Sequence, residues 1–147
     1  MIIVCSTELD ADPDRTWRVL TDWERQASWM PDVAWVRPIG PERGLGAYLE
    51  IRTKIFGIPL LTDRARVIVW EPPTRLAIEH LGLVVGAGEW QLRRLNGNRT
   101  RLTWTERIRL APAVVGDLAL WLYGPVQRWM IKRSLRNLVE LIVDQGG

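Results

Sequence analysis

Residues 113–144, AVVGDLALWLYGPVQRWMIKRSLRNLVELIVD, decide the fold of this chain. In the second half of the stretch, apolar residues recur at spacings of four, three and four, at Ile131, Leu135, Leu138 and Ile142. Charged residues lie off this stripe, so the pattern predicts a helix that buries one face. Such a helix needs an apolar surface to receive its stripe, and a sheet built by the preceding residues is the expected partner.

The first half of the stretch is apolar around its whole circumference, from Val114 to Leu122. It must therefore be surrounded by apolar groups or touch something apolar. Gly124-Pro125 separates the two halves, and because proline removes a backbone donor we expect a kink or a new helix start there. The apolar run is too short to span a bilayer and contains Asp117, so we expect no integral membrane segment and at most a peripheral contact.

The residues before this helix predict two short helices and a sheet. Ile2–Leu9 is expected to form a strand, Asp12-Pro13 is typical of a helix start, and a second short helix is expected from about Asp22 to Met30. Alternating apolar residues bounded by turn residues predict six further strands, at 33–39, 47–56, 59–70, 74–81, 88–95 and 100–110. The expected fold class is α+β, with a seven-stranded antiparallel sheet.

Composition limits the class of protein. At 147 residues the chain is most economically one domain, residues 1–147. The net charge of +3 comes from scattered basic and acidic residues, which argues against a nucleic-acid partner. With one cysteine, Cys5, and one histidine, neither a disulfide nor a metal site is expected, and we expect no cofactor. No apolar segment follows a basic start, so we expect no signal peptide and a cytoplasmic location.

The order of one strand, two short helices, six strands and a long helix resembles the helix-grip fold of the START, polyketide cyclase and pollen-allergen-like superfamily (SRPBCC). The local features that resemble it are Ala11-Asp12-Pro13 with Trp17, Trp29-Met30-Pro31, Trp70-Glu71-Pro72-Pro73 and Thr100-Arg101-Leu102-Thr103-Trp104. The resemblance covers essentially the whole chain. It implies a curved sheet that wraps the C-terminal helix and leaves a ligand cavity between them, and it does not name the ligand.

Side-chain alternation assigns the faces of the last two predicted strands. On the final strand, one acidic residue, Glu106, shares the inner face with apolar residues. A three-residue loop at 96–98 gives a register with three inward pairs, Leu92 with Leu102, Trp90 with Trp104 and Gly88 with Glu106. Because glycine has no side chain, Gly88 is expected to leave a gap beside Glu106.

The preceding hairpins bring further ionisable side chains to this face. A four-residue turn at 71–74 pairs Ala65 with His80. With a loop at 83–85, His80 would also lie opposite Gly88. Three ionisable residues are therefore expected to converge on one end of an otherwise apolar concave face: Asp63, His80 and Glu106.

Three interpretations of this cluster stay open. In the first, His80 and Glu106 form a satisfied buried pair, or one of them lies at the rim and extends to water. In the second they orient a hydroxyl or carbonyl of a ligand, and in the third they act as general acid and base. Under the last interpretation the predicted catalytic residues are Glu106, His80 and Asp63. The predicted pocket walls are Gly88, Trp90, Leu92, Leu102, Trp104, Leu118, Trp121, Leu122, Tyr123 and Trp129.

The leading hypothesis is a protein that binds a small hydrophobic molecule, lipid-like or aromatic and polyketide-like, between sheet and helix. The resemblance implies an alternative, an enzyme similar to the aromatase/cyclase members, in which pocket acid and base residues steer ring closure. A third hypothesis is a lipid-handling or partner-binding protein that acts through the apolar first half of the long helix. The sequence leaves the oligomeric state open, a homodimer included.

Overall fold

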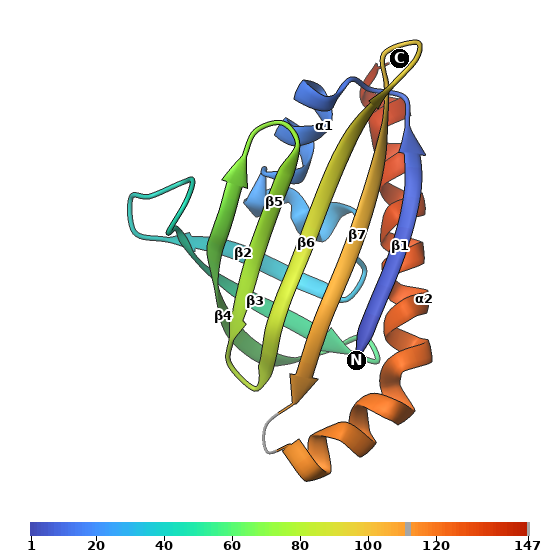
Figure 1. Cartoon of the computed structure of the whole chain (residues 1–147). Coiled ribbons are helices and arrows are strands. Elements are labelled where there is room, and N and C mark those ends of the chain that lie inside the picture. The colour runs from blue at the N-terminus through green and yellow to red at the C-terminus, as the bar shows by residue number, and fades with distance from the viewer. Residues whose placement is uncertain (111–112, 147) are drawn as a thin grey trace.

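The computed structural model describes residues 1–110 and 113–146, with the side chains of 1–109, 118–119 and 121–146. It shows a curved, open sheet of seven antiparallel strands with a long C-terminal helix along it (Figure 1). The strand order is β1-β7-β6-β5-β4-β3-β2, so the first two strands of the chain form the two edges of the sheet. The predicted α+β helix-grip fold is confirmed.

The predicted order of elements is also confirmed. The elements are β1 (Ile2–Leu9), α1 (Pro13–Leu20), the 3-10 helix η1 (Trp23–Ser28), β2 (Val33–Ile39), β3 (Tyr48–Ile55), β4 (Ile58–Glu71), β5 (Arg75–Leu81), β6 (Val84–Leu95), β7 (Arg99–Leu110) and α2 (Ala113–Gly146). The largest difference from the predicted bounds is in β6, which begins at Val84 rather than at Gly88. The strand starts earlier because residues 84–87 already pair with β7, and the loop before it lies one residue earlier in the chain than predicted.

Local sequence sets the start of α1. The Asp12 side chain accepts a hydrogen bond from the backbone N–H of Arg15 at 2.8 Å, and Pro13 occupies the first turn, where no backbone donor is needed. The helix buries Trp17, whose ring lies edge-on to that of Trp70 on β4, with 5.1 Å between centroids. This contact fixes α1 against the concave side of the sheet.

The two halves of α2 differ as the sequence indicated. The apolar stripe of the second half is fully buried, at Ile131, Leu135, Leu138 and Ile142. The helix continues through Pro125 without a new start, and its first turns run at an angle to the rest, in agreement with the predicted kink (Figure 1). Across the described residues, no helix has both the length and the apolar character needed to cross a membrane.

The predicted register of the last hairpin is confirmed. All three inward pairs are present, Leu92 with Leu102, Trp90 with Trp104 and Gly88 with Glu106. Leu95 pairs with Arg99, so the loop at 96–98 has three residues, and Asn98 takes the left-handed conformation (φ 56°) that this loop length requires. The inner face of β6 and β7 was therefore determined by local sequence.

The register of His80 is partly confirmed and partly corrected. His80 pairs with Ala65 as predicted, although the turn is one residue shorter and a β-bulge in β4, between Val67 and Val69, takes up the difference. On its other side His80 pairs with Gly86, not with Gly88. The predicted and observed partners of His80 differ by two residues. Because side chains alternate with a period of two, His80 still faces inward.

Three tryptophans form the centre of the core. The indoles of Trp90 and Trp104, on neighbouring strands, meet nearly perpendicular at 5.6 Å between centroids. Trp29, which follows η1, lies 5.9 Å from the first and 6.2 Å from the second. This cluster fills the concave side at one end, and the space beyond it is open.

Candidate functional site

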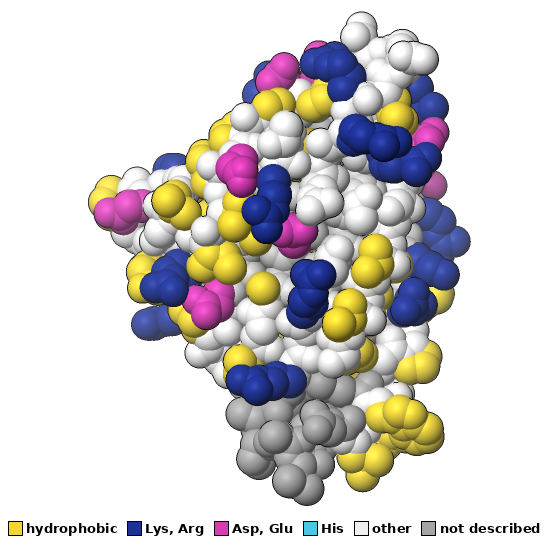
Figure 2. Space-filling view, in the orientation of Figure 1, with side chains coloured by type: hydrophobic (Ala, Val, Ile, Leu, Met, Phe, Trp, Pro, Cys, Tyr) yellow, Lys and Arg dark blue, Asp and Glu magenta, His cyan; other side chains and the backbone are white. Residues whose placement is uncertain are grey.

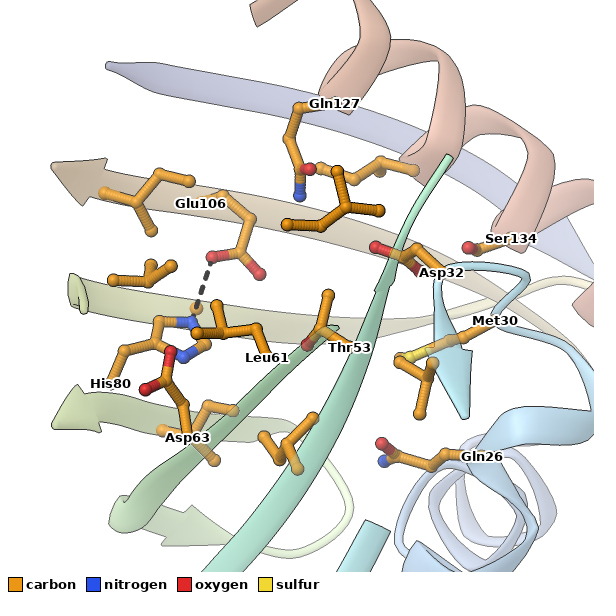
Figure 3. Close-up of a pocket in the computed structure, with 18 of the residues that line it drawn as sticks. Gln26, Met30, Asp32, Thr53, Leu61, Asp63, His80, Glu106, Gln127 and Ser134 are labelled. Carbon is orange, nitrogen blue, oxygen red and sulfur yellow. Dashed lines mark hydrogen bonds and ion pairs between the residues drawn. The ribbon is translucent and has the colours of Figure 1, made fainter. Parts of the chain in front are cut away.

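A cavity of about 600 Å³ lies between the concave face of the sheet, η1 and the first half of α2. Most of its wall is apolar, and the aromatic part includes Trp23, Trp90 and Trp104. Figure 3 shows the polar side chains that reach into it from β3, β4, β5, β7, η1, α2 and the turn before β2. A cavity of this size and lining suits a small, mainly apolar molecule.

Glu106 and His80 face each other in the cavity wall (Figure 3). Oε2 of Glu106 lies 3.4 Å from Nε2 of His80, and Oε1 accepts a hydrogen bond from Nε1 of Trp104 at 2.8 Å. Only 7% of the Glu106 surface is exposed. A buried carboxylate held by two neighbours has a fixed orientation, so it can either position a ligand or exchange a proton with one.

Gly88 provides the space for this carboxylate. A Cβ atom at Gly88 would lie 2.7 Å from Oε1 of Glu106, which is closer than such contacts occur. The predicted gap between β6 and β7 therefore exists, and Glu106 occupies it.

Asp63 lies beside His80 at the same end of the cavity (Figure 3). Its Oδ1 accepts a hydrogen bond from the backbone N–H of Leu83 at 3.1 Å, so the carboxylate also caps the turn between β5 and β6. A side chain at Gly82 would overlap Asp63, which explains why the turn has glycine at that position. The three ionisable residues predicted from the sequence all line one cavity, and their functional roles stay predictions.

Sequence reasoning missed a fourth ionisable residue, Asp32, which lines the cavity directly before β2. Burial raises the pKa of the Asp32 carboxyl, and the nearby Glu106 carboxylate raises it further. Burial also raises the pKa of Tyr123 on α2, with a contribution from Asp32. Asp32 directly follows Trp29-Met30-Pro31 and precedes β2. Strand alternation therefore could not predict the direction of the Asp32 side chain.

Several other predicted pocket residues are placed as expected. Gly88, Trp90, Trp104, Leu122 and Tyr123 line the cavity. On α2 the lining residues recur at helical spacing, at Ala119, Leu122, Tyr123 and Val126. One face of the first half of α2 therefore closes the cavity.

Five of the predicted wall residues do not line the cavity. Leu92 and Leu102 pack in the core, because they lie beyond the tryptophan cluster along β6 and β7. Leu118 and Trp121 point away from the cavity, and 74% of Trp121 is exposed. Trp129 is half exposed, with the guanidinium of Arg133 5.3 Å from its ring centroid. The sequence could not separate the faces of the first half of α2, because that half is apolar on all sides.

Among the described residues, no group of three or more His, Cys, Asp or Glu side chains is arranged to hold a metal ion. The described cavity lining includes three carboxylates and one imidazole but no lysine or arginine side chain. The basic residues of the sheet point outward, where several pair with acidic neighbours, for example Arg75 with Glu89 at 2.7 Å. Figure 2 shows such basic side chains spread over one outer surface of the molecule.

The open sheet around a long helix, with a cavity between them, defines a helix-grip protein of the START and polyketide cyclase superfamily. Residues 2–143 match the model of the family described as polyketide cyclase / dehydrase and lipid transport, and the chain belongs to that family. A comparison with curated proteins found no match.

Solved structures with the same fold come from several bacteria. The Zhui aromatase/cyclase from Streptomyces sp. R1128 superposes with a TM-score of 0.85 at 19% identity, covering 100% of this chain and 96% of that one. The protein TTHA0849 from Thermus thermophilus gives a TM-score of 0.81 at 18% identity, with 100% of both chains covered. A START superfamily protein from Mycobacterium smegmatis gives 0.72 at 15% identity, covering 95% and 97%. At these identities the likeness concerns the fold.

Proposed function

We propose that the protein binds a small hydrophobic molecule, lipid-like or aromatic, in the cavity between the sheet and α2. The observation that carries the proposal is the cavity of about 600 Å³ with a mainly apolar wall and a small set of polar groups. A hollow of this size in a protein interior costs stability, because its lining loses packing contacts that side chains would otherwise make. A cavity retained at this cost is typical of a ligand site.

Binding would be measured through tryptophan fluorescence with apolar probes, because Trp23, Trp90 and Trp104 all line the cavity. Ala119→Trp, which fills the cavity from α2, should abolish quenching by the probe. Leu118→Trp is the matched control, because Leu118 is the neighbouring residue and is exposed. Native mass spectrometry of freshly purified protein would show whether a host molecule accompanies the chain. Equal binding by both variants would contradict the cavity as the site.

The second candidate is an enzyme that uses the pocket acid and base groups. The observation that favours it is the pair of Glu106 and His80, a carboxylate and an imidazole at 3.4 Å inside an apolar cavity. The Zhui structure is described as an aromatase/cyclase, which supports testing polyketide-like substrates. Catalysis predicts that Glu106→Gln removes turnover and leaves binding intact. Loss of both together would favour a role in binding alone.

A third candidate, lipid handling or partner binding through the outer side of α2, is favoured by the exposure of Leu118, Trp121 and Trp129. Flotation with anionic vesicles, reversed by salt, is the expected outcome if this surface contacts a membrane. No flotation together with normal probe binding would leave the cavity as the functional feature.

A further inference from the structure

The cavity wall has more acidic than basic side chains, and this excess indicates which charge a ligand should carry. Asp32, Asp63 and Glu106 are the acidic residues of the lining, and His80 is its one basic side chain among the described residues. The side chains outside the described set, those of residues 110–117, 120 and 147, include no lysine or arginine. Even with a proton on His80, the acidic groups of the lining outnumber the basic one.

Glu106 is the one carboxylate of the three that faces a basic side chain, and neither Asp32 nor Asp63 forms an ion pair within the described residues. Glu106 contacts His80 and Trp104, and Asp63 accepts from the backbone of Leu83. Within the described part of the chain, the Asp32 side chain forms no ion pair, although it is buried in the cavity wall. It points into the same space as Glu106 and Gln127 in Figure 3.

The electrostatic coupling between Asp32 and Glu106 indicates where a compensating charge would lie. Burial disfavours the negative charge of Asp32 by raising its pKa, and the nearby Glu106 carboxylate raises that pKa further. A cation between them relieves this repulsion and gains charge-assisted hydrogen bonds. An anionic ligand would add a further negative charge to a cavity whose described lining offers no lysine or arginine to pair with it.

The aromatic part of the wall also favours a positive charge on the ligand. Trp23, Trp90, Trp104, Phe56 and Tyr123 line the cavity. The faces of aromatic rings carry partial negative charge and attract ammonium groups, most strongly where water is excluded. Carboxylates and aromatic rings together therefore form a lining that accepts a positively charged group on an apolar body.

We propose that the ligand of this cavity is a hydrophobic amine, whose protonated nitrogen lies between Asp32 and Glu106 and whose apolar body packs against the indole wall. This inference rests on the proposed binding function and narrows it from hydrophobic molecules in general to cationic ones. It disfavours fatty acids and other apolar anions. It assigns Asp32, which sequence reasoning missed, as the residue that selects the charge of the ligand.

The test uses the full chain and two matched sets of probes, decylamine, decanol and decanoate, and 3-phenylpropylamine, 3-phenylpropanol and 3-phenylpropanoate. Calorimetry or tryptophan fluorescence gives the Kd of each. In at least one set we expect the amine to bind about tenfold more tightly than the alcohol, the size of a single favourable charged hydrogen bond, and the acid to bind most weakly. An alcohol or acid that binds as tightly as the amine in both sets would overturn the inference and leave the proposed function standing. No binding by any of the six probes would contradict both.

Two variants test whether Asp32 is the residue that sets the preference for amines. Asp32→Asn should weaken amine binding about tenfold and change alcohol binding by less than about threefold, because the amide keeps the shape of the side chain and removes its charge. Glu50→Gln is the matched control, since it removes one carboxylate from β3, where Glu50 lies between the cavity-lining neighbours Leu49 and Ile51 and so faces outward. Circular dichroism confirms that each variant is folded. An equal loss of amine preference in both variants would mean that net charge, not Asp32, sets the selectivity, and would overturn the assignment.

Discussion

Gly88 on β6 pairs with Glu106 on β7, and the missing side chain of the glycine is the space in which the carboxylate lies. Neighbouring strands place inward side chains about 5 Å apart, too close for a second side chain to share that space. The position of the Glu106 carboxylate thus depends on a cavity-lining residue that has no side chain.

Gly88→Ala should displace Glu106 from His80 and Trp104. The new Cβ would lie 2.7 Å from Oε1, and the side-chain end of Glu106 can rotate away more easily than the backbone can move. We expect a loss of about 1 kcal/mol in the free energy of unfolding, the value of one hydrogen bond. The ring-nitrogen NMR signals of His80, the only histidine, should shift.

A double-mutant cycle provides the control for this prediction. In the Glu106→Ala background the carboxylate is absent, so Gly88→Ala should cost almost nothing. An equal cost in both backgrounds would show that the glycine is needed for its backbone and not for the space that it leaves.

Asp32→Asn should stabilise the protein at neutral pH. Burial and the nearby Glu106 raise the pKa of Asp32 in the folded state, so the folded protein binds this proton more tightly than the unfolded chain does. The stabilising contribution of the protonated carboxyl is present below the ordinary pKa of aspartate and is lost as the pH rises through the raised value. The neutral amide avoids that loss, which is worth about 1.4 kcal/mol for each pKa unit of the shift.

Thermal or urea unfolding of both proteins between pH 3 and pH 8 checks this expectation. The advantage of Asp32→Asn should be largest at the neutral end and should disappear near pH 3. A constant difference across the range would mean that the effect is one of packing and not of charge.

Phe56→Ala should speed the release of a bound ligand. Phe56, at the tip of the hairpin between β3 and β4, is 77% exposed, yet its ring lies edge-on to that of Tyr123 on α2 with 6.3 Å between centroids. Both residues line the cavity, so their contact bridges sheet and helix at its opening. If the two rings must separate before the ligand leaves, loss of this aromatic contact should raise the dissociation rate about two- to tenfold.

Stopped-flow measurement of probe dissociation tests this role. Ile58→Ala, in the same hairpin and also exposed, should leave the dissociation rate unchanged. Equal rates for the wild type and Phe56→Ala would contradict a gating contact.

The two halves of α2 should respond differently to mutation. Leu138 is 0% exposed and packs in the core, so Leu138→Ala should lower the free energy of unfolding by about 2–5 kcal/mol. Trp121→Ser should change it by less than about 0.5 kcal/mol, because the indole faces outward. Chemical denaturation measures both changes. A large loss in Trp121→Ser would mean that the indole has a packing partner in solution.

Where side chains alternate without interruption, the sequence predicted both fold and site. Clean alternation and a short turn gave the register of β6 and β7, and hence the pairing of Gly88 with Glu106. The buried stripe of α2 was likewise readable from its spacing. His80 was assigned to the correct face only because the error in its pairing was two residues, which leaves the face unchanged.

The sequence by itself determined the elements, their order and the inward direction of Glu106, because periodicities of two and 3.6 residues are local properties of the backbone. Tertiary structure alone decided which face of the first half of α2 closes the cavity, since that half is apolar on every side. It also decided that Asp32, outside any regular strand, lies near Glu106. Long-range contacts between segments far apart in the chain set these two features, and no local pattern encodes them.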